Sequence, residues 1–97
     1  MATKEQILAL LKEYKKISSK EFGITKMGVF GSVARGTFKQ GSDIDIVVEL
    51  NKRNLLNRIG LKLSLEKFLG IPVDVIAYRE ELSPLLKKNI KKDVIYV

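Results

Sequence analysis

Hydrophobic residues recur with helical spacing at the start of the chain. The run from Thr3 to Gln6 matches a capping box, Thr-x-x-Gln, and predicts the first turn of a helix. Gly23 suits the left-handed conformation that ends many helices, so we expect the helix to end there. The apolar residues between these ends fall at i, i+3, i+4, i+7 and i+10 and predict one amphipathic face, made of Ile7, Leu10, Leu11, Tyr14 and Ile17.

The spacing changes to two residues in the next part of the chain. Residues 24–30 predict a strand that enters a turn at Gly31. Residues 43–50 alternate between apolar and polar and predict a second strand, with Asp43 and Asp45 on one face. The apolar residues of its other face are Ile44, Ile46 and Val48.

A second helix is predicted after this strand. We expect Asn51 or Asn54 to cap a helix that runs to about Leu69, where Gly70 and Pro72 end it. A helix of this kind turns its apolar stripe toward the core. The residues expected to form that stripe are Leu55, Leu56, Ile59, Leu63 and Phe68.

A short strand and a last helix complete the chain. Residues 73–77 are apolar apart from Asp74 and predict a third strand. Ser83 is expected to cap the last helix, with Pro84 at its first position, where the missing N–H costs nothing. Residues 94–97 predict a terminal strand. The expected buried side of the last helix consists of Leu85, Leu86 and Ile90.

The predicted order of elements is helix, strand, strand, helix, strand, helix and strand. The turn between the first two strands predicts an antiparallel pair, and the helix before the third strand predicts a crossover. We therefore expect an α/β (α+β) fold, a small mixed β-sheet flanked by helices. A chain of 97 residues and 11.0 kDa has room for one core, so residues 1–97 are expected to form a single domain.

Composition excludes several kinds of catalysis. The chain has no Cys and no His, so thiol nucleophiles, imidazole bases and cysteine-based zinc sites are excluded. What remains is carboxylates, Lys, Arg, hydroxyl groups and hard metal ions. The sequence also has neither an apolar run long enough to span a bilayer nor the form of a signal peptide, and we expect a cytoplasmic protein.

The net charge of +7 attracts polyanions, which makes nucleic acid one candidate partner. Fourteen of the 18 basic residues are lysines, however, and lysine-rich helix faces are ordinary solubilising surfaces. The lysines of the last predicted helix show this pattern and are Lys87, Lys88, Lys91 and Lys92. Charge alone therefore favours a solvated surface over a nucleic-acid site.

Three carboxylates are the main chemical signal. Asp43 and Asp45 lie on one face of a predicted strand, with Cβ atoms roughly 6–7 Å apart. Like charges this close repel unless a cation or water separates them. Asp74 is the candidate third acid because an isolated charge in an apolar strand is costly unless paired with Lys or Arg or bound to metal. Carboxylate oxygens suit Mg²⁺, and two such ions can assist phosphoryl transfer.

A possible phosphate site precedes the acids. Gly31 permits close approach of the backbone, and Ser32 can begin a helical turn whose N–H groups favour an anion. Arg35 can either contact phosphate or brace the loop through an ion pair. Taken alone, Gly31-Ser32 is more often a structural turn. The conjunction of this turn with the acids, in this order, favours a nucleotide site.

These residues resemble the signature of the nucleotidyltransferase superfamily typified by DNA polymerase beta. The resemblance rests on two segments, Gly31-Ser32-Val33-Ala34-Arg35-Gly36 and Gly41-Ser42-Asp43-Ile44-Asp45-Ile46. The short length and the segment from Ile71 to Ile76 make the chain similar to the minimal nucleotidyltransferases, the MNT or MntA-like group.

The resemblance implies a site of three acids and a nucleotide. Asp43, Asp45 and Asp74 would hold two Mg²⁺ ions and carry catalysis, while Gly31-Ser32, Arg35 and Ser42 would line the nucleotide site. It further implies transfer of AMP from ATP to a tyrosine of a HEPN-domain ribonuclease toxin. In that role the chain is the antitoxin of a type VII toxin–antitoxin pair, and it can form a hetero-oligomer with the toxin.

Three other functions stay open at this point. The chain can be a non-catalytic module that neutralises a toxin by binding it, or a basic nucleic-acid-binding domain that uses residues 83–92. It can also transfer a nucleotide to a small molecule such as an aminoglycoside. Without bound metal, the acids would repel nucleic acid, and the missing substrate domain disfavours the small molecule.

Overall fold

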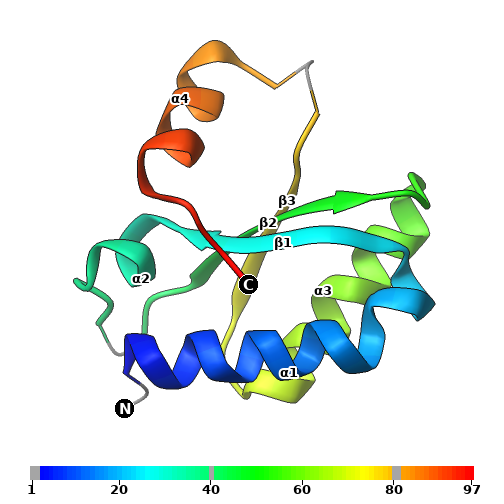
Figure 1. Ribbon diagram of the computed structural model, residues 1–97, viewed down its shortest axis with the longest axis horizontal. Coiled ribbons are helices and arrows are strands. Elements are labelled where there is room, and N and C mark those ends of the chain that lie inside the picture. Colours follow the sequence, from blue (N-terminus) through cyan, green and yellow to red (C-terminus); the bar gives the residue numbers. More distant parts are fainter. Residues whose placement is uncertain (1–2, 40, 80–81) are drawn as a thin grey trace.

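The computed structural model describes residues 3–39, 41–79 and 82–97 and shows helices packed on a mixed sheet (Figure 1). The helices in these ranges are α1 (Lys4–Phe22), α2 (Gly31–Arg35), α3 (Leu55–Leu69) and α4 (Pro84–Asp93). The strands are β1 (Ile24–Phe30), β2 (Ile44–Leu50), β3 (Val73–Ala77) and β4 (Ile95–Tyr96). Apart from α2, which the sequence suggests only as a helical turn beginning at Ser32, this order is the one that the sequence predicts.

The sheet has the order β3-β2-β1-β4. β1 pairs antiparallel with β2 and with β4, whereas β3 lies parallel to β2. The predicted antiparallel pair and the predicted crossover are both confirmed. The parallel register sets Asp45 opposite Asp74, an adjacency on which the sequence alone is silent.

The helix ends follow local sequence signals. Thr3 and Gln6 form both hydrogen bonds of the capping box, and Gly23 ends α1 in the left-handed conformation. Asn54, rather than Asn51, caps α3 by accepting a hydrogen bond from the Asn57 N–H. These ends depend on contacts within a few residues, which is why the sequence predicts them well.

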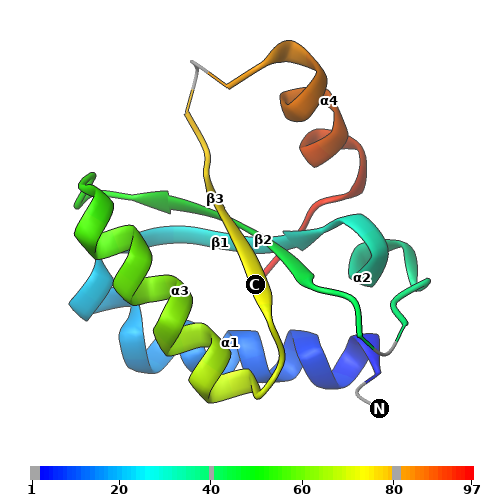
Figure 2. The same ribbon diagram turned by 180° about the vertical axis from the view of Figure 1, so that it is seen from behind.

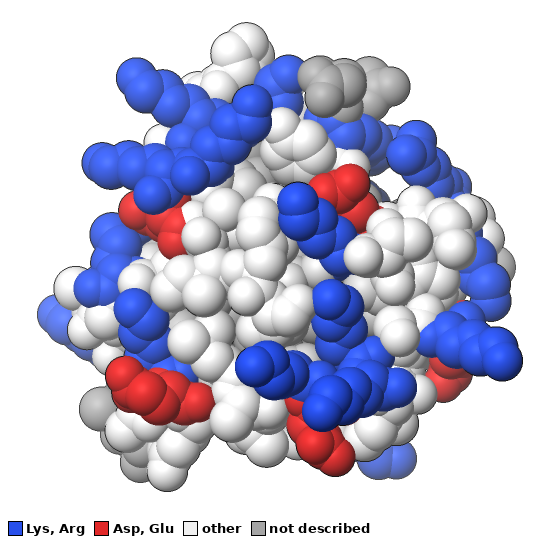
Figure 3. All heavy atoms as spheres, in the orientation of Figure 1, with Lys and Arg blue, Asp and Glu red and all other residues white. Residues whose placement is uncertain are grey.

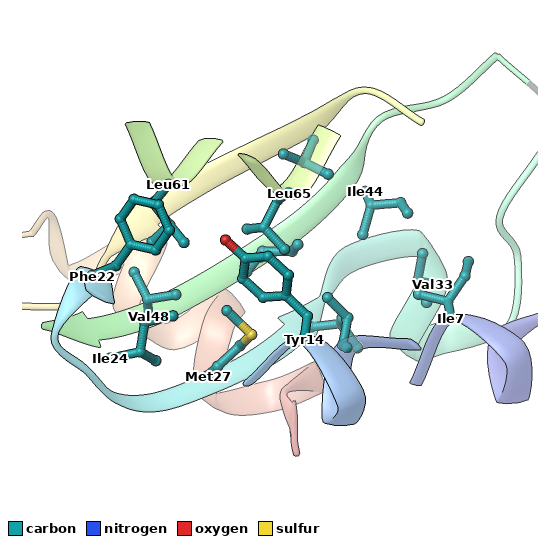
Figure 4. Close-up of a cluster of buried hydrophobic side chains, with 14 of the residues drawn as sticks. Ile7, Tyr14, Phe22, Ile24, Met27, Val33, Ile44, Val48, Leu61 and Leu65 are labelled. Atoms are coloured by element: carbon teal, nitrogen blue, oxygen red, sulfur yellow. The ribbon is translucent and has the colours of Figure 1, made fainter. Parts of the chain in front are cut away.

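α1 and α3 cover one face of the sheet, and α4 stands on the other (Figures 1 and 2). Figure 4 shows the larger core between the two helices and the sheet, where Tyr14, Leu61 and Leu65 point toward the strand residues Ile44 and Val48. A smaller cluster beneath α4 joins Phe30, Val47 and Ile90. The sheet is therefore closed by a large apolar core on one side and by a small one on the other.

The predicted apolar stripe of α3 is wrong. Leu61 and Leu65 are fully buried, whereas most of the predicted stripe points outward and exposes Leu55, Leu56, Ile59 and Leu63. Phe68 is the exception, because its ring packs edge-on against Tyr14 of α1, with ring centroids 5.3 Å apart, although it is partly exposed. The physical reason is that α3 is apolar on both sides, so spacing alone does not tell which side meets the sheet.

Smaller departures occur in the other helices. On α1, Ile7, Leu11 and Tyr14 are buried as predicted, but Leu10 and Ile17, at one side of the stripe, are exposed. On α4, Ile90 is buried and Leu86 is partly buried, whereas Leu85 is exposed.

The surface is basic but mixed. Figure 3 shows Lys and Arg spread over the face with α1 in front, with acidic groups between them and a gathering of basic groups where α4 lies. None of the helices described is long and apolar enough to cross a bilayer.

Candidate active site

Two of the three predicted acids lie on neighbouring strands. Asp45 is in β2 and Asp74 is its register partner in β3, on the face of the sheet that α4 partly covers. Asp43 lies one residue before β2, in the exposed segment that leads into it. Asp45 is partly buried and Asp74 is exposed, so the site opens to solvent on the β3 side.

The acids influence one another electrostatically. Burial raises the pKa of Asp45 above its usual value, and the neighbouring charges of Asp74 and Asp43 raise it further, while Arg35 acts in the opposite direction. Negative charge is therefore concentrated around Asp45, and a cation bound there would relieve the repulsion.

The donor set fits a hard divalent cation, because every candidate ligand is a carboxylate. In the part of the chain that the structure describes, no three His, Cys, Asp or Glu side chains are drawn together as a ready metal cluster. The fit therefore rests on the type of donor and on the concentration of negative charge around Asp45, rather than on a preformed cage.

Gly31 lies directly against Asp45. Its φ of +69° is in the left-handed region, and a Cβ atom added there would overlap the Asp45 carboxylate. Any other residue would therefore be strained and would displace the acid. The sequence predicts Gly31 for close approach of phosphate, and the structure adds the approach of the backbone to Asp45.

The short helix α2 is tied to the molecule at several points. The Ser32 carbonyl accepts a hydrogen bond of 2.9 Å from the Thr37 N–H, and Lys4 Nζ donates to the Ala34 carbonyl at 3.0 Å. The side chain of Arg35 forms an ion pair of 2.7 Å with Asp93 of α4. Of the two roles that the sequence leaves open for Arg35, the structure shows the bracing ion pair.

Ser42 completes the set of predicted nucleotide-binding residues. Its N–H donates to the Lys39 carbonyl at 3.1 Å, and the residue is partly buried just before Asp43. Ser32 and Ser42 flank the connection between β1 and β2. The fold thus brings the Gly31-Ser32 turn, the acids and Arg35 to one end of the sheet.

Some residues near the site do not stand out in the sequence. Asp93 pairs with Arg35 from the end of α4, and Arg53, Arg58 and Arg79 line one hollow at the other end of β3. These residues come from separate segments of the chain, so no spacing pattern links them. Only the packing of α3 and α4 around the sheet brings them together.

A mixed sheet that sets two carboxylates on neighbouring parallel strands, next to a Gly-Ser turn, is an arrangement suited to nucleotidyl transfer. The family described as Nucleotidyltransferase domain matches residues 11–97. This chain belongs to that family and is a nucleotidyltransferase.

Relatives of similar length support this assignment. The protein adenylyltransferase MntA of Thermococcus cleftensis is 38% identical over 98 residues, which cover all of this chain and 98% of that protein. A solved structure described provisionally as a minimal nucleotidyltransferase is 33% identical, with a TM-score of 0.81 over 97% of this chain and 95% of the other.

A third match shows the fold alone. It is a solved structure of an MNT antitoxin in complex with the tri-AMPylated HEPN toxin of Shewanella oneidensis. The identity is 21%, with a TM-score of 0.60 over 96% of this chain and 66% of the other. The expected mixed sheet flanked by helices is confirmed as a fold of this family.

Proposed function

We propose that this chain transfers AMP from ATP to a tyrosine hydroxyl of a HEPN-type ribonuclease toxin and acts as the antitoxin of that pair. The observation that carries the proposal is the pairing of Asp45 with Asp74 beside the Gly31 turn. Because the small domain leaves its acids open to solvent, a second protein can present the acceptor hydroxyl directly.

The reaction follows from the chemistry of the acceptor. The tyrosine oxygen forms a bond to the α-phosphorus of ATP, the bond between the α-phosphorus and the bridging oxygen breaks, and pyrophosphate leaves. The hydroxyl proton passes to solvent. Two Mg²⁺ ions, when held by Asp43, Asp45 and Asp74, would supply positive charge for the phosphates and lower the pKa of the attacking hydroxyl.

The other residues of the site have distinct proposed roles. The backbone at Gly31 and the hydroxyl groups of Ser32 and Ser42 bind the triphosphate. Arg35 adds positive charge near Asp45 and, through its ion pair with Asp93, holds α2 against α4. In this arrangement Arg35 positions the turn and also balances part of the negative charge.

The relatives support the proposed substrate and partner. The similar Thermococcus cleftensis protein is named a protein adenylyltransferase. The Shewanella oneidensis complex pairs an antitoxin of this fold with an AMPylated HEPN toxin. A protein acceptor, a HEPN toxin as partner and the adenine nucleotide are therefore the natural first choices for this chain.

The test uses ATP labelled at the α-phosphate, Mg²⁺ and a HEPN-domain protein of the same organism as the candidate toxin. We expect label on the toxin, none when ATP is labelled at the γ-phosphate, and none with the Asp45→Asn variant. Replacement of the acceptor tyrosine by phenylalanine should also abolish labelling. An unlabelled toxin in the complete reaction would refute AMP transfer.

The same variant separates catalysis from simple binding. If Asp45→Asn still protects cells from the toxin at normal expression, then neutralisation occurs through complex formation instead of AMP transfer. If protection is lost while the complex still forms, AMP transfer is the mechanism of neutralisation.

A further inference from the structure

The outward face of α3 is apolar and exposed. Its residues lie at i, i+1, i+4 and i+8 and are Leu55, Leu56, Ile59 and Leu63. Leu56 is 81% exposed, and Ile59, the most covered of the four, is still 43% exposed. A helix that is apolar on both sides is normally covered on both sides, and an exposed apolar stripe of this kind marks an interaction surface.

This stripe leads into a groove beside β3, the edge strand of the sheet. Figure 2 shows α3 next to β3, with α4 beyond the far end of the strand. Ile59 lines a groove of about 390 Å³ together with Val75, Ile76 and Leu86. Asp74 and Lys62 also line this groove, so the groove connects the apolar stripe with the candidate catalytic acid.

A second hollow, of about 270 Å³, continues the groove away from Asp74. The two hollows share Arg58, Ala77 and Arg79, and the second is also lined by Arg53. Three of the four arginines of the chain thus gather here, although arginine is scarce and lysine abundant elsewhere. The guanidinium group binds carboxylates through two parallel hydrogen bonds, which a lysine ammonium does not do.

We propose that the outward stripe of α3 and the arginine-lined groove together form the docking surface for the acceptor protein. The matching segment of the acceptor is apolar on one side and carries Asp or Glu on the other. Docked in this way, it runs along β3 toward Asp74 and brings the acceptor hydroxyl to the site. The inference rests on the proposed function and names the surface that recognises its protein substrate.

Charge and polarity favour this occupant over two others. A second copy of the chain would bring Arg53, Arg58 and Arg79 against the same arginines, at a net charge of +7 for each copy. A nucleic acid would pair with the arginines but would leave the leucines of α3 exposed. An amphipathic acidic segment satisfies both parts of the surface.

The experiment measures the affinity of the HEPN protein for this chain by calorimetry without ATP. One variant, Leu56→Asp, disrupts the stripe, and a triple variant, Arg53→Glu with Arg58→Glu and Arg79→Glu, disrupts the groove. We expect each to weaken binding at least tenfold, the loss of one strong interface contact. Only the loss caused by the triple variant should shrink in high salt.

Matched controls carry the same chemical changes elsewhere. Leu85→Asp alters an exposed leucine of α4, and Lys12→Glu with Lys16→Glu and Lys20→Glu reverses three exposed charges of α1. Both should bind within about twofold of the original chain. Circular dichroism verifies folding, and single Arg→Gln changes replace the triple variant if it does not fold.

Each outcome is decisive. Undetectable binding of the original chain, or equal losses in the stripe, groove and control variants, overturns the inference. The inference is also overturned if Leu56→Asp dissociates a homodimer of this chain but leaves binding to the HEPN protein unchanged. The same holds if the triple arginine variant loses binding to a 20-nucleotide RNA but still binds the HEPN protein normally. If the toxin binds through this surface but receives no AMP, the proposed reaction fails while the docking surface stands.

Discussion

The two faces of β2 differ in chemistry along the same seven residues. Toward α1 and α3 the strand presents Ile44, Ile46 and Val48, all buried in the large core. Toward α4 it presents Asp45, which lies beside other negative charges and has a raised pKa. The first face contributes only apolar contacts to stability, whereas the second combines the buried Val47 with an electrostatic cost at Asp45 that Arg35 relieves in part and a bound cation would relieve further. The difference is the reason why we propose that the active site lies on the face toward α4.

The largest expected effect comes from the charged face. Asp45→Asn should lower the rate of AMP transfer by about a hundred- to a thousandfold, the usual cost of losing one electrostatic partner of the transition state. Glu49→Gln, on the same face of β2 but farther from Asp74, is the matched control and should leave the rate unchanged. Release of pyrophosphate measures both.

The same variant also tests the electrostatic cost. Removing the charge of Asp45 relieves its repulsion with Asp74 and Asp43, so the free energy of unfolding without metal should not fall. A loss of stability in urea would contradict the contrast between the two faces.

The next effect concerns the apolar face. Leu61→Ala should lower the free energy of unfolding by about 2–5 kcal/mol, because it leaves a cavity in the large core. Leu56→Ala, on the same helix but 81% exposed, should change it by less than about 0.5 kcal/mol. Urea denaturation compares the two, and equal losses would show that the outward side of α3 is also packed.

A smaller effect is expected at Gly31, where the backbone lies against the Asp45 carboxylate. Gly31→Ala forces a residue with a side chain into the left-handed region and against Asp45, whereas Gly36→Ala meets no atom within 4 Å. Both pay the cost of the backbone conformation, and Gly31→Ala should lose about 1 kcal/mol more and much of its activity. Thermal melting and the transfer assay test this. Equal melting temperatures and equal activities of the two variants would show that the close contact between Gly31 and Asp45 has no effect on stability or catalysis.

The smallest effect concerns a polar group within the large core. The Tyr14 hydroxyl donates a 2.9 Å hydrogen bond to Ser64, so Tyr14→Phe should cost about 0.5–1.5 kcal/mol. Burial raises the pKa of Tyr14, and the folded state therefore holds the phenolic proton more tightly than the unfolded state. Its contribution is complete below a pH of about 10 and is lost as the pH rises through the raised pKa.

This pH dependence can be measured by urea denaturation of the original chain and of Tyr14→Phe between pH 8 and roughly 11. The difference in stability between them should shrink toward the alkaline end. Parallel curves would mean that the hydroxyl titrates alike in the folded and unfolded states.

Local signals in the sequence predict the elements well because each depends on nearby residues. The Thr3 capping box, the left-handed Gly23 and the Ser83-Pro84 start of α4 all appear as expected. Packing is less predictable. α3 carries leucines on both sides, and its buried side is decided by Leu61 and Leu65 meeting the sheet, which helical spacing does not show.

The candidate site divides in the same way. The Gly31-Ser32 turn, Asp43 and Asp45 are visible in the sequence because they lie close together along the chain. Asp74 becomes convincing only when the parallel register sets it opposite Asp45. The arginine-lined groove has no sequence signal, since its residues converge from separate segments.

By itself, the sequence determined the order of the elements other than α2, most of their ends, and the absence of His and Cys that leaves carboxylates as the main candidates for chemistry. These features depend on propensity, capping and residue type, which act over a few positions. Tertiary structure alone decided which side of α3 is buried, how Asp45 and Asp74 meet, and that Arg35 pairs with Asp93. Those outcomes depend on contacts between segments that are far apart in the sequence, and such contacts are decided only when the whole chain is packed.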